Sequence, residues 1–244
     1  MSSEIAALLG TADHVLVQFD GPVCSVFDAT WRRTAAQRLT SLVGSDLPRK
    51  VAAADDPFAV LRFAEACGEL TAQVVDRQLS RLESEAVFVG TQTPGAADAL
   101  RLLFGAGYTV TIIGNIGVDA IRSFLIMSGL AEEVRRVSAR GSARRTRLLP
   151  DPFLLNLAIE ALGTSPDRCV FVAGSVAGVE AGKAAGVPVI GYATDGRERR
   201  RFLRHQADAV VETMSELDWS PGRLGAGAGG GPVDLPRPHA AGLT

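Results

Sequence analysis

Short, almost continuous apolar runs constrain the fold of this chain more than any other feature of its sequence. Helical segments separate successive runs, and each run ends in a loop that contains polar residues or glycine. Apolar residues at nearly every position are typical of strands in a parallel sheet, because helices cover both faces of such a sheet. The runs span Val15–Phe19, Tyr108–Ile113, Cys169–Ala173, Val187–Gly191 and Asp208–Val211.

Residues that typically begin helices lie between successive runs. Thr93-Pro94 and Asp151-Pro152 each place a proline where a helix begins, and Ser175 is a predicted N-cap for a helix that ends at Gly186. Strands that alternate with helices predict right-handed crossovers. We therefore expect an α/β fold, a Rossmann-like doubly wound parallel sheet that binds ligands at the carboxyl ends of its strands.

Residues 25–87 interrupt this alternation. Asp56-Pro57 begins one predicted helix, and Val75, Leu79 and Leu82 lie on one face of a second, at i, i+4 and i+7. We expect an α/β core of residues 1–24 and 88–220 with a small all-helical cap of residues 25–87 inserted after the first strand. Residues 221–244 are rich in glycine and proline and are predicted to form a disordered tail.

Composition narrows the classes of partner. The 244 residues are 47% apolar and carry a net charge of −2, which gives one sizeable core and no overall attraction to nucleic acid or to an anionic membrane. No apolar run has the roughly 18 residues of a membrane span. The odd number of cysteines, without metal-type spacing, indicates a cytoplasmic protein.

Two arginine-rich runs are predicted to be solvated faces: Arg135, Arg136, Arg140, Arg144, Arg145 and Arg147, then Arg197, Arg199, Arg200, Arg201 and Arg204.

Polar or glycine residues follow the predicted strands at the edge where ligands bind. Gln18 lies near the end of the first run and Asp20 directly follows it, with a spacing typical of two carboxylates, but the first of them is an amide. Asp20 either acts as an acid or base or ties down the turn through its own backbone. The other candidate pocket positions are Cys24, Gly114, Asn115 and Ser175. Helix capping is the favoured role of the last two, and a catalytic thiolate at Cys24 is disfavoured.

Several segments carry a resemblance to a known family. They are Phe19-Asp20-Gly21-Pro22, Thr93-Pro94-Gly95, Gly129-Leu130, Pro150-Asp151-Pro152 and Ala181-Gly182 with Ala184-Ala185-Gly186. In this order and spacing they resemble the haloacid dehalogenase-like hydrolases that have a helical cap. The resemblance covers roughly residues 12–219 and implies a phosphatase-type scaffold.

The resemblance also implies roles for the loop after the first strand. In the family a first Asp attacks phosphorus and forms an aspartyl phosphate, and a second Asp two residues later donates a proton to the leaving group. Gln18 stands at the first position, where an amide cannot form an acyl phosphate, and Asp20 keeps the second.

The remaining family positions are also changed. The position of a phosphate-binding Ser or Thr is Gly114, and the position of a lysine is Leu149. The positions of the acids that hold magnesium are Gly174 and Gly178. Arg147, two residues before the lysine position, is expected at the surface, and its alternative is a swing into the site.

These losses lead us to expect a pseudophosphatase that serves as a binding or regulatory protein. The alternative is a repurposed, metal-independent enzyme that acts on a non-phosphate small molecule with Asp20 as acid or base. A residual phosphatase is the least favoured function. We expect no cofactor and no metal ligands, and a small molecule or a protein as partner.

Overall fold

One parallel sheet forms the centre of the protein. The computed structural model describes residues 3–44, 47–141 and 145–217, and within them six strands lie in the order β3-β2-β1-β4-β5-β6. This order is that of a doubly wound Rossmann-like sheet, which confirms the predicted fold class. The strands are β1 (His14–Gln18), β2 (Thr109–Gly117), β3 (Val134–Arg140), β4 (Cys169–Ala173), β5 (Val189–Tyr192) and β6 (Ala209–Val211).

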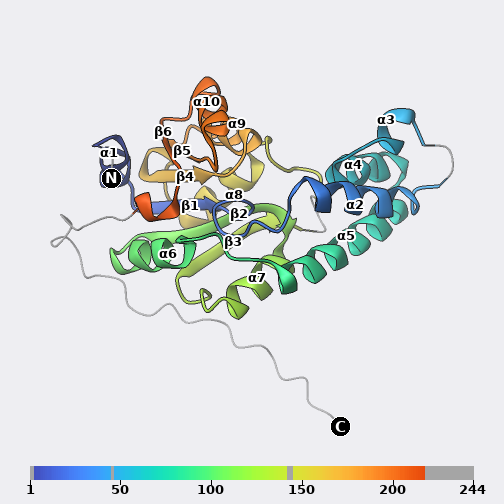
Figure 1. Cartoon of the computed structure of the whole chain (residues 1–244), viewed down its shortest axis with the longest axis horizontal. Helices are drawn as coiled ribbons and strands as arrows, with labels where there is room; N and C mark the ends of the chain where they lie inside the picture. Colours follow the sequence, from blue (N-terminus) through green and yellow to red (C-terminus); the bar gives the residue numbers. More distant parts are fainter. Residues whose placement is uncertain (1–2, 45–46, 142–144, 218–244) are drawn as a thin grey trace, which may run out of the picture.

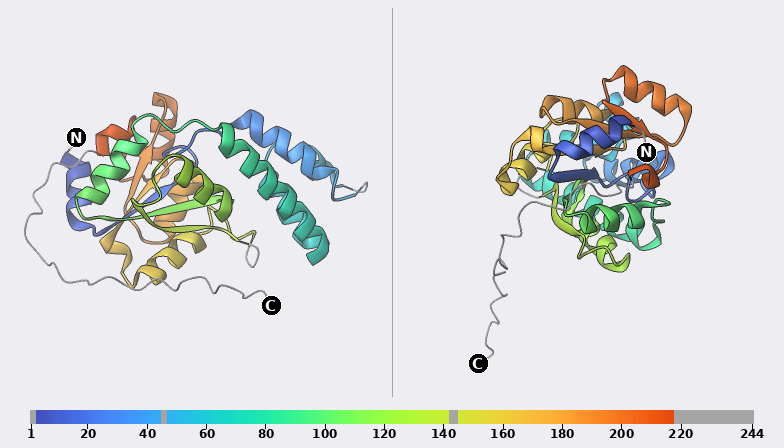
Figure 2. Two further views of the ribbon diagram at one scale, coloured as in Figure 1. Left: turned by 90° about the horizontal axis from the view of Figure 1, so that it is seen from below. Right: turned by 90° about the vertical axis from the view of Figure 1, so that its left-hand side faces the viewer.

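Helices cover both faces of this sheet (Figures 1 and 2). Right-handed crossovers place α6 and α7 on one face and α8 and α9 on the other. None of the described helices is both long and apolar enough to cross a membrane. The helices of this part of the chain are α1 (Ser3–Thr11), α6 (Ala96–Gly105), α7 (Val118–Met127), α8 (Phe153–Leu162), η2 (Pro166–Arg168), α9 (Val176–Ala184), α10 (Gly196–Arg204) and η3 (Met214–Leu217).

Strand β3 was not predicted from the sequence. It pairs only with β2 and therefore forms one edge of the sheet, where exposed Arg135 and Arg136 interrupt the apolar pattern. The prediction of a solvated face is wrong for Arg140 and Arg145, which are only 3% and 5% exposed. Position 144 lies outside the described residues. The second arginine run is exposed on α10, as predicted.

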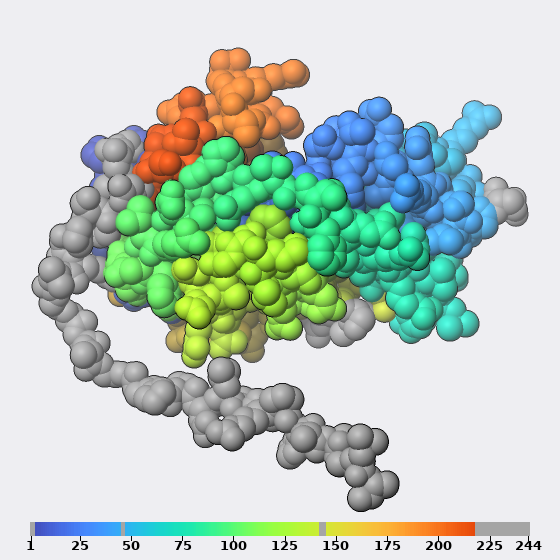
Figure 3. Space-filling model, turned by 60° about the horizontal axis from the view of Figure 1, so that its bottom comes forward, coloured from blue at the N-terminus to red at the C-terminus, as the bar shows by residue number. Residues whose placement is uncertain are grey.

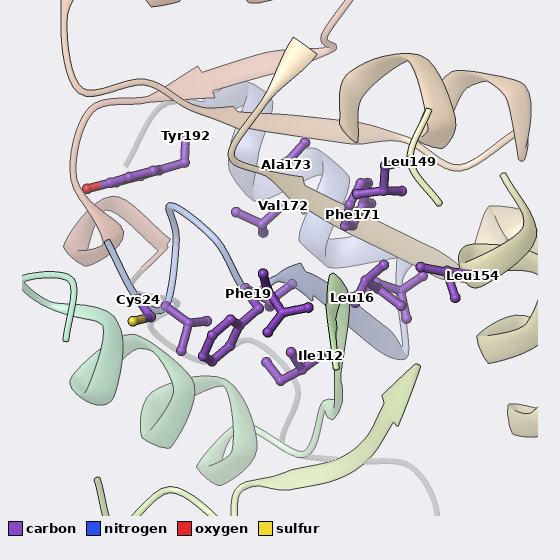
Figure 4. Packing of buried hydrophobic residues seen from close by; sticks show 14 of the residues in the cluster. Leu16, Phe19, Cys24, Ile112, Leu149, Leu154, Phe171, Val172, Ala173 and Tyr192 are labelled. Atoms are coloured by element: carbon purple, nitrogen blue, oxygen red, sulfur yellow. The ribbon is translucent and has the colours of Figure 1, made fainter. Parts of the chain in front are cut away.

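The apolar core extends from the sheet into the loop that follows β1. Val15, Leu16 and Val17 are completely buried, and Phe19 continues this packing just beyond the strand. The ring of Phe19 makes an edge-to-face contact with Phe124 of α7, with 5.3 Å between the ring centroids. Figure 4 shows Phe19 among the side chains of this core. Burial of such a ring contributes on the order of 2 kcal/mol or more, so it holds the start of the loop in place.

Four helices lie together beyond the carboxyl ends of the strands (Figure 1). They are α2 (Ala29–Thr40), α3 (Arg49–Ala52), α4 (Pro57–Cys67) and α5 (Glu69–Val89). Asp28 caps α2, and Asp56 caps α4 through the amide of Phe58 at 3.2 Å. Gly68 has a φ of +130° that allows the chain to turn from α4 into α5. The division into core, cap and tail stays a prediction, and residues 221–244 lie outside the described part of the chain.

Candidate active site

A cavity of about 260 Å³ lies between the carboxyl edge of the sheet and helices α2 and α4. This volume is near the lower limit of small-molecule sites. Four of the five predicted pocket positions line it, together with Asp20, as the strand-end rule predicts. Its lining residues are Gln18, Asp20, Arg32, Asp56, Phe58, Arg62, Gly114, Asn115, Ile116, Leu149, Pro150, Ser175 and Ala177.

Asp20 sits in a tight turn after β1. Gly21 adopts a φ of +99°, and its amide donates to the carbonyl of Cys24 at 2.9 Å. A side chain at position 21 would be strained in this conformation, and its Cβ would lie 3.2 Å from the Cα of Gly174. The turn is therefore packed against the loop after β4, which directs Asp20 into the cavity.

The carboxylate of Asp20 has one close cationic partner. Arg32 of α2 donates to it and also donates through Nε to the carbonyl of Phe27 at 3.0 Å. Burial raises the pKa of Asp20 from 3.8 to about 6, although the charge and hydrogen bond of Arg32 oppose the rise; the nearby Asp28 adds to it. A carboxyl group with such a pKa exchanges its proton close to neutral pH.

Arg62 of α4 adds a second cation to the cavity. Its closest recorded carboxylate contact is to Asp56 at 3.5 Å, and half of its side chain is exposed. With Asp20 and Asp56 ionised, the two arginines balance two carboxylates. With Asp20 protonated, the four side chains carry a net charge of +1, which favours a bound anion.

Gln18 lines the cavity and also fastens the end of β1 to the loop after β4. Its Oε1 accepts from the amide of Gly174 at 3.1 Å, and its Nε2 donates to Ser175 Oγ at 3.2 Å. The side chain of Ser175 also accepts from the amide of Gly178 at 3.0 Å, so it caps α9 as predicted. Gln18 is 5% exposed, and this network satisfies its buried amide.

The residues present do not fit the magnesium ion that the family resemblance implies. A Cβ at Gly178 would lie 2.2 Å from Gln18 Oε1, and one at Gly174 would lie 2.5 Å from the carbonyl oxygen of Asp20. An acidic side chain at position 174 would therefore collide with the backbone, and one at position 178 would displace the side chain of Gln18. Within the described ranges, no group of three or more His, Cys, Asp or Glu residues is placed to hold a metal ion. We assign no step of the chemistry to a metal.

The phosphate-binding position and the lysine position of the family, Gly114 and Leu149, both lie in closely packed surroundings. A Cβ at Gly114 would meet Ile121 Cδ1 at 2.9 Å, so the space of the family's hydroxyl side chain is filled. Leu149 points into the apolar packing and is 6% exposed (Figure 4). The side-chain amide of Asn115 accepts a hydrogen bond from the backbone amide of Leu149 at 2.9 Å and donates one to the backbone carbonyl of Leu149 at 3.4 Å.

Two of the residues considered from the sequence lie away from the cavity. Cys24 is completely buried among apolar side chains (Figure 4), and this burial raises the pKa of its thiol to about 11. It is therefore a neutral thiol near pH 7, not a nucleophilic thiolate. Arg147 makes two hydrogen bonds to Asp151, each 3.1 Å long, and its guanidinium lies 4.6 Å from the ring centroid of Phe153.

Sequence reasoning missed the cations of the cavity. Arg32 and Arg62 belong to helices of the insert, and no family motif marks them. One available signal was the position of Arg32 shortly after Asp20 on the first helix of that insert.

Comparison with known proteins identifies the scaffold. Residues 15–186 match the family described as "Hydrolase: haloacid dehalogenase-like hydrolase", which is most of the chain. The chain belongs to the haloacid dehalogenase-like hydrolases. This confirms the resemblance seen in the sequence.

Relatives of this chain include phosphatases. It is 28% identical to a phosphoglycolate phosphatase of Rhodospirillum rubrum over 192 residues, which are 76% of this chain and 78% of the relative. A predicted phosphoglycolate phosphatase from Haemophilus somnus 129pt shares the fold, with a TM-score of 0.62 and 15% identity over 85% of this chain and 96% of the other. A hydrolase from Deinococcus radiodurans R1, solved with bound phosphate and sodium, has a TM-score of 0.56 and 25% identity over 85% and 93%.

These relatives contradict the prediction of a pseudophosphatase that serves as a binding or regulatory protein. They also contradict the alternative of an enzyme for non-phosphate molecules, because they point to phosphatase function. The physical reason for the error is that the prediction counted charges at motif positions alone. The cavity obtains two cations from α2 and α4, at positions that no motif marks.

Proposed function

We propose that this hydrolase cleaves a small phosphate monoester in the cavity beside Asp20, without an aspartyl-phosphate intermediate and without a metal ion. The observation that carries the proposal is a carboxyl group with a pKa of about 6 that shares a cavity with two arginines. The phosphoglycolate phosphatases among its relatives make phosphoglycolate the first substrate to test.

Substrate binding is coupled to the proton on Asp20. At pH 7 a group with a pKa of 6 is protonated in about a tenth of the molecules. Protonation ends the ion pair with Arg32, whose side chain is 40% exposed and has room to turn toward a phosphate. A dianionic phosphate therefore favours the protonated form of Asp20 and takes Arg32 and Arg62 as its counter-charges.

The chemical step then uses Asp20 as general acid. Protonated Asp20 gives its proton to the ester oxygen as the bond from that oxygen to phosphorus breaks, while water forms a new bond to phosphorus on the opposite side. The products are the alcohol and inorganic phosphate; the attacking water loses one proton to solvent, and Asp20 regains one from solvent. Arg32 and Arg62 stabilise the charge on the phosphoryl oxygens. The amide of Gln18 takes no covalent part.

Helices α2 to α5 act as a cap in this proposal. Two of them supply the arginines, and Phe58 of α4 adds a buried apolar wall to the cavity. A partly closed cavity strengthens the interaction between the arginines and the phosphate, because less water screens it.

The test is release of inorganic phosphate from phosphoglycolate by the purified protein, with and without EDTA. Asp20→Asn should lower kcat by about 100-fold or more, the usual size of general acid–base effects. Asp55→Asn is the matched control, because Asp55 is an exposed carboxylate outside the cavity. Activity that survives Asp20→Asn, or that requires magnesium, would refute the mechanism, and no turnover by the wild-type protein would refute the function.

The role of Arg32 has its own control on the same helix. Arg32→Gln should raise KM by about tenfold or more, because it removes a charge-assisted contact to the phosphate. Arg33→Gln should leave KM unchanged, because Arg33 pairs with exposed Asp55 at 3.3 Å and does not line the cavity.

A further inference from the structure

A buried ionic cluster joins helix α5 to the end of strand β3. The guanidinium of Arg140 binds Asp76 and Glu83, and the side chains of Arg140 and Glu83 are 1% and 0% exposed. Arg145 adds hydrogen bonds of 3.0 and 3.1 Å to Glu69. Glu69, Asp76 and Glu83 are seven residues apart, so they form one stripe along α5 that faces the two arginines.

The same guanidinium reaches the wall of the cavity. Arg140 Nε donates to the carbonyl of Asn115 at 3.2 Å, and the amide of Asn115 holds Leu149 through both its nitrogen and its oxygen. Glu83 accepts from the amide of Gly117 at 2.9 Å. The end of β2 is therefore held from α5 on one side and fastened to the Leu149 loop on the other.

Packing supports the polar contacts. Helix α5 packs against α7, and Figure 3 shows their atoms in direct contact, with α5 in teal and α7 in yellow-green. Burial raises the pKa of Glu83, and the hydrogen bond from the Gly117 amide opposes that rise. Loss of the Arg140 charge would leave a buried carboxylate without its counter-ion, so the cluster resists separation of α5 from the sheet.

We propose that Arg140 is a positioning residue for the cavity: it clamps α5 to the end of β2, and through Asn115 it holds the Leu149 wall in place during turnover. This inference rests on the proposed function for its catalytic meaning, but the clamp itself is a property of the fold.

Hydrogen exchange tests the clamp without any need for turnover. The amide of Leu149 is protected by Asn115 Oδ1, and the amide of Gly117 is protected by Glu83 Oε2. Arg140→Lys keeps a positive charge but lacks the fork that reaches Asn115, Asp76 and Glu83 together. It should speed exchange of both amides by about tenfold or more. Arg136→Lys, an exposed change on the same strand, is the control.

A second variant keeps the proposal testable if Arg140→Lys does not fold. Asp76→Asn removes one of the two carboxylates on Arg140 and preserves the side-chain shape, so it should speed Leu149 exchange by several-fold. Unchanged Leu149 exchange in either folded variant would overturn the clamp.

Kinetics then separates a positioning role from a purely structural one. With phosphoglycolate, Arg140→Lys should raise KM by about tenfold while the pH dependence of kcat stays as in the wild-type protein, because Asp20 does not contact the cluster. If the wild-type protein shows no turnover, the proposed function fails and the exchange experiment still decides the clamp. If the wild-type protein turns over and Arg140→Lys speeds exchange but leaves KM unchanged, only the positioning role is refuted.

Discussion

The pKa of Asp20 predicts an unusual pH dependence of stability. Burial raises this pKa from 3.8 to about 6 in the folded protein, so between these two values the folded state binds more protons than the unfolded state. The free energy of unfolding therefore falls as pH rises through this window, since stability decreases with pH wherever the native state holds the extra proton. A rise of roughly 2 pKa units corresponds to about 3 kcal/mol.

Asp20→Asn removes this titration. The free energy of unfolding of the variant, relative to that of the wild-type protein, should increase by about 2 to 3 kcal/mol between about pH 4 and pH 7.5. Loss of the contact to Arg32 subtracts less than about 1 kcal/mol, because that side chain is 40% exposed and is readily solvated. At pH 7.5 the variant should thus be the more stable protein, although it lacks the proposed general acid.

Urea unfolding followed by circular dichroism at several pH values measures this difference. Asp55→Asn controls for the removal of one carboxylate from the surface. A stability difference between Asp20→Asn and wild type that does not change with pH would show that Asp20 is already ionised at ordinary acidity. In that case it would have no proton to donate near neutrality, and the general-acid role would fail.

Three other outcomes follow from the packing of the site. Gly178→Ala should lower the free energy of unfolding by about 1 to 3 kcal/mol, because its Cβ would lie 2.2 Å from Gln18 Oε1; Gly105→Ala, with nothing within 4 Å, should not, and thermal denaturation compares the two. Gln18→Asp should not increase kcat with phosphoglycolate, because the positions that would hold a metal remain closed. Iodoacetamide should modify exposed Cys67 in the native protein and leave buried Cys24 unmodified, as mass spectrometry of the intact protein can show.

The fold was predictable from the sequence because its strongest signals are local. Apolar runs and helix start signals located five of the six described strands within a few residues, and parallel crossovers then left few topologies. Strand β3 was not predicted because an edge strand pairs with only one neighbouring strand and tolerates exposed charged residues such as Arg135 and Arg136. Arg140 and Arg145 looked like the rest of that run, since burial by a helix more than 50 residues away leaves no mark on local composition.

The site was predictable only at the strand ends. Gln18, Asp20, Gly114, Asn115 and Ser175 lie at or just beyond the carboxyl ends of strands in one parallel sheet, so topology alone brings them to one edge. Arg32 and Arg62 lie on helices whose faces depend on how α2 and α4 pack. A local pattern does not contain that orientation, so the sequence suggested a cavity without cations and, from it, the wrong function.

The substitutions at the family positions depend on one another. Gln18 makes its hydrogen bonds to the loop after β4 because Gly174 and Gly178 leave it room. The turn at Gly21 packs onto Gly174. An acidic side chain at position 174 or 178 would displace this network, and a carboxylate at position 18 would meet no cation there, because Leu149 is buried in the core. The inner part of the site is therefore a neutral structural joint, and the charge available for chemistry has moved outward to Asp20, Arg32 and Arg62. In the proposed reaction this outer group supplies both the acid and the cations.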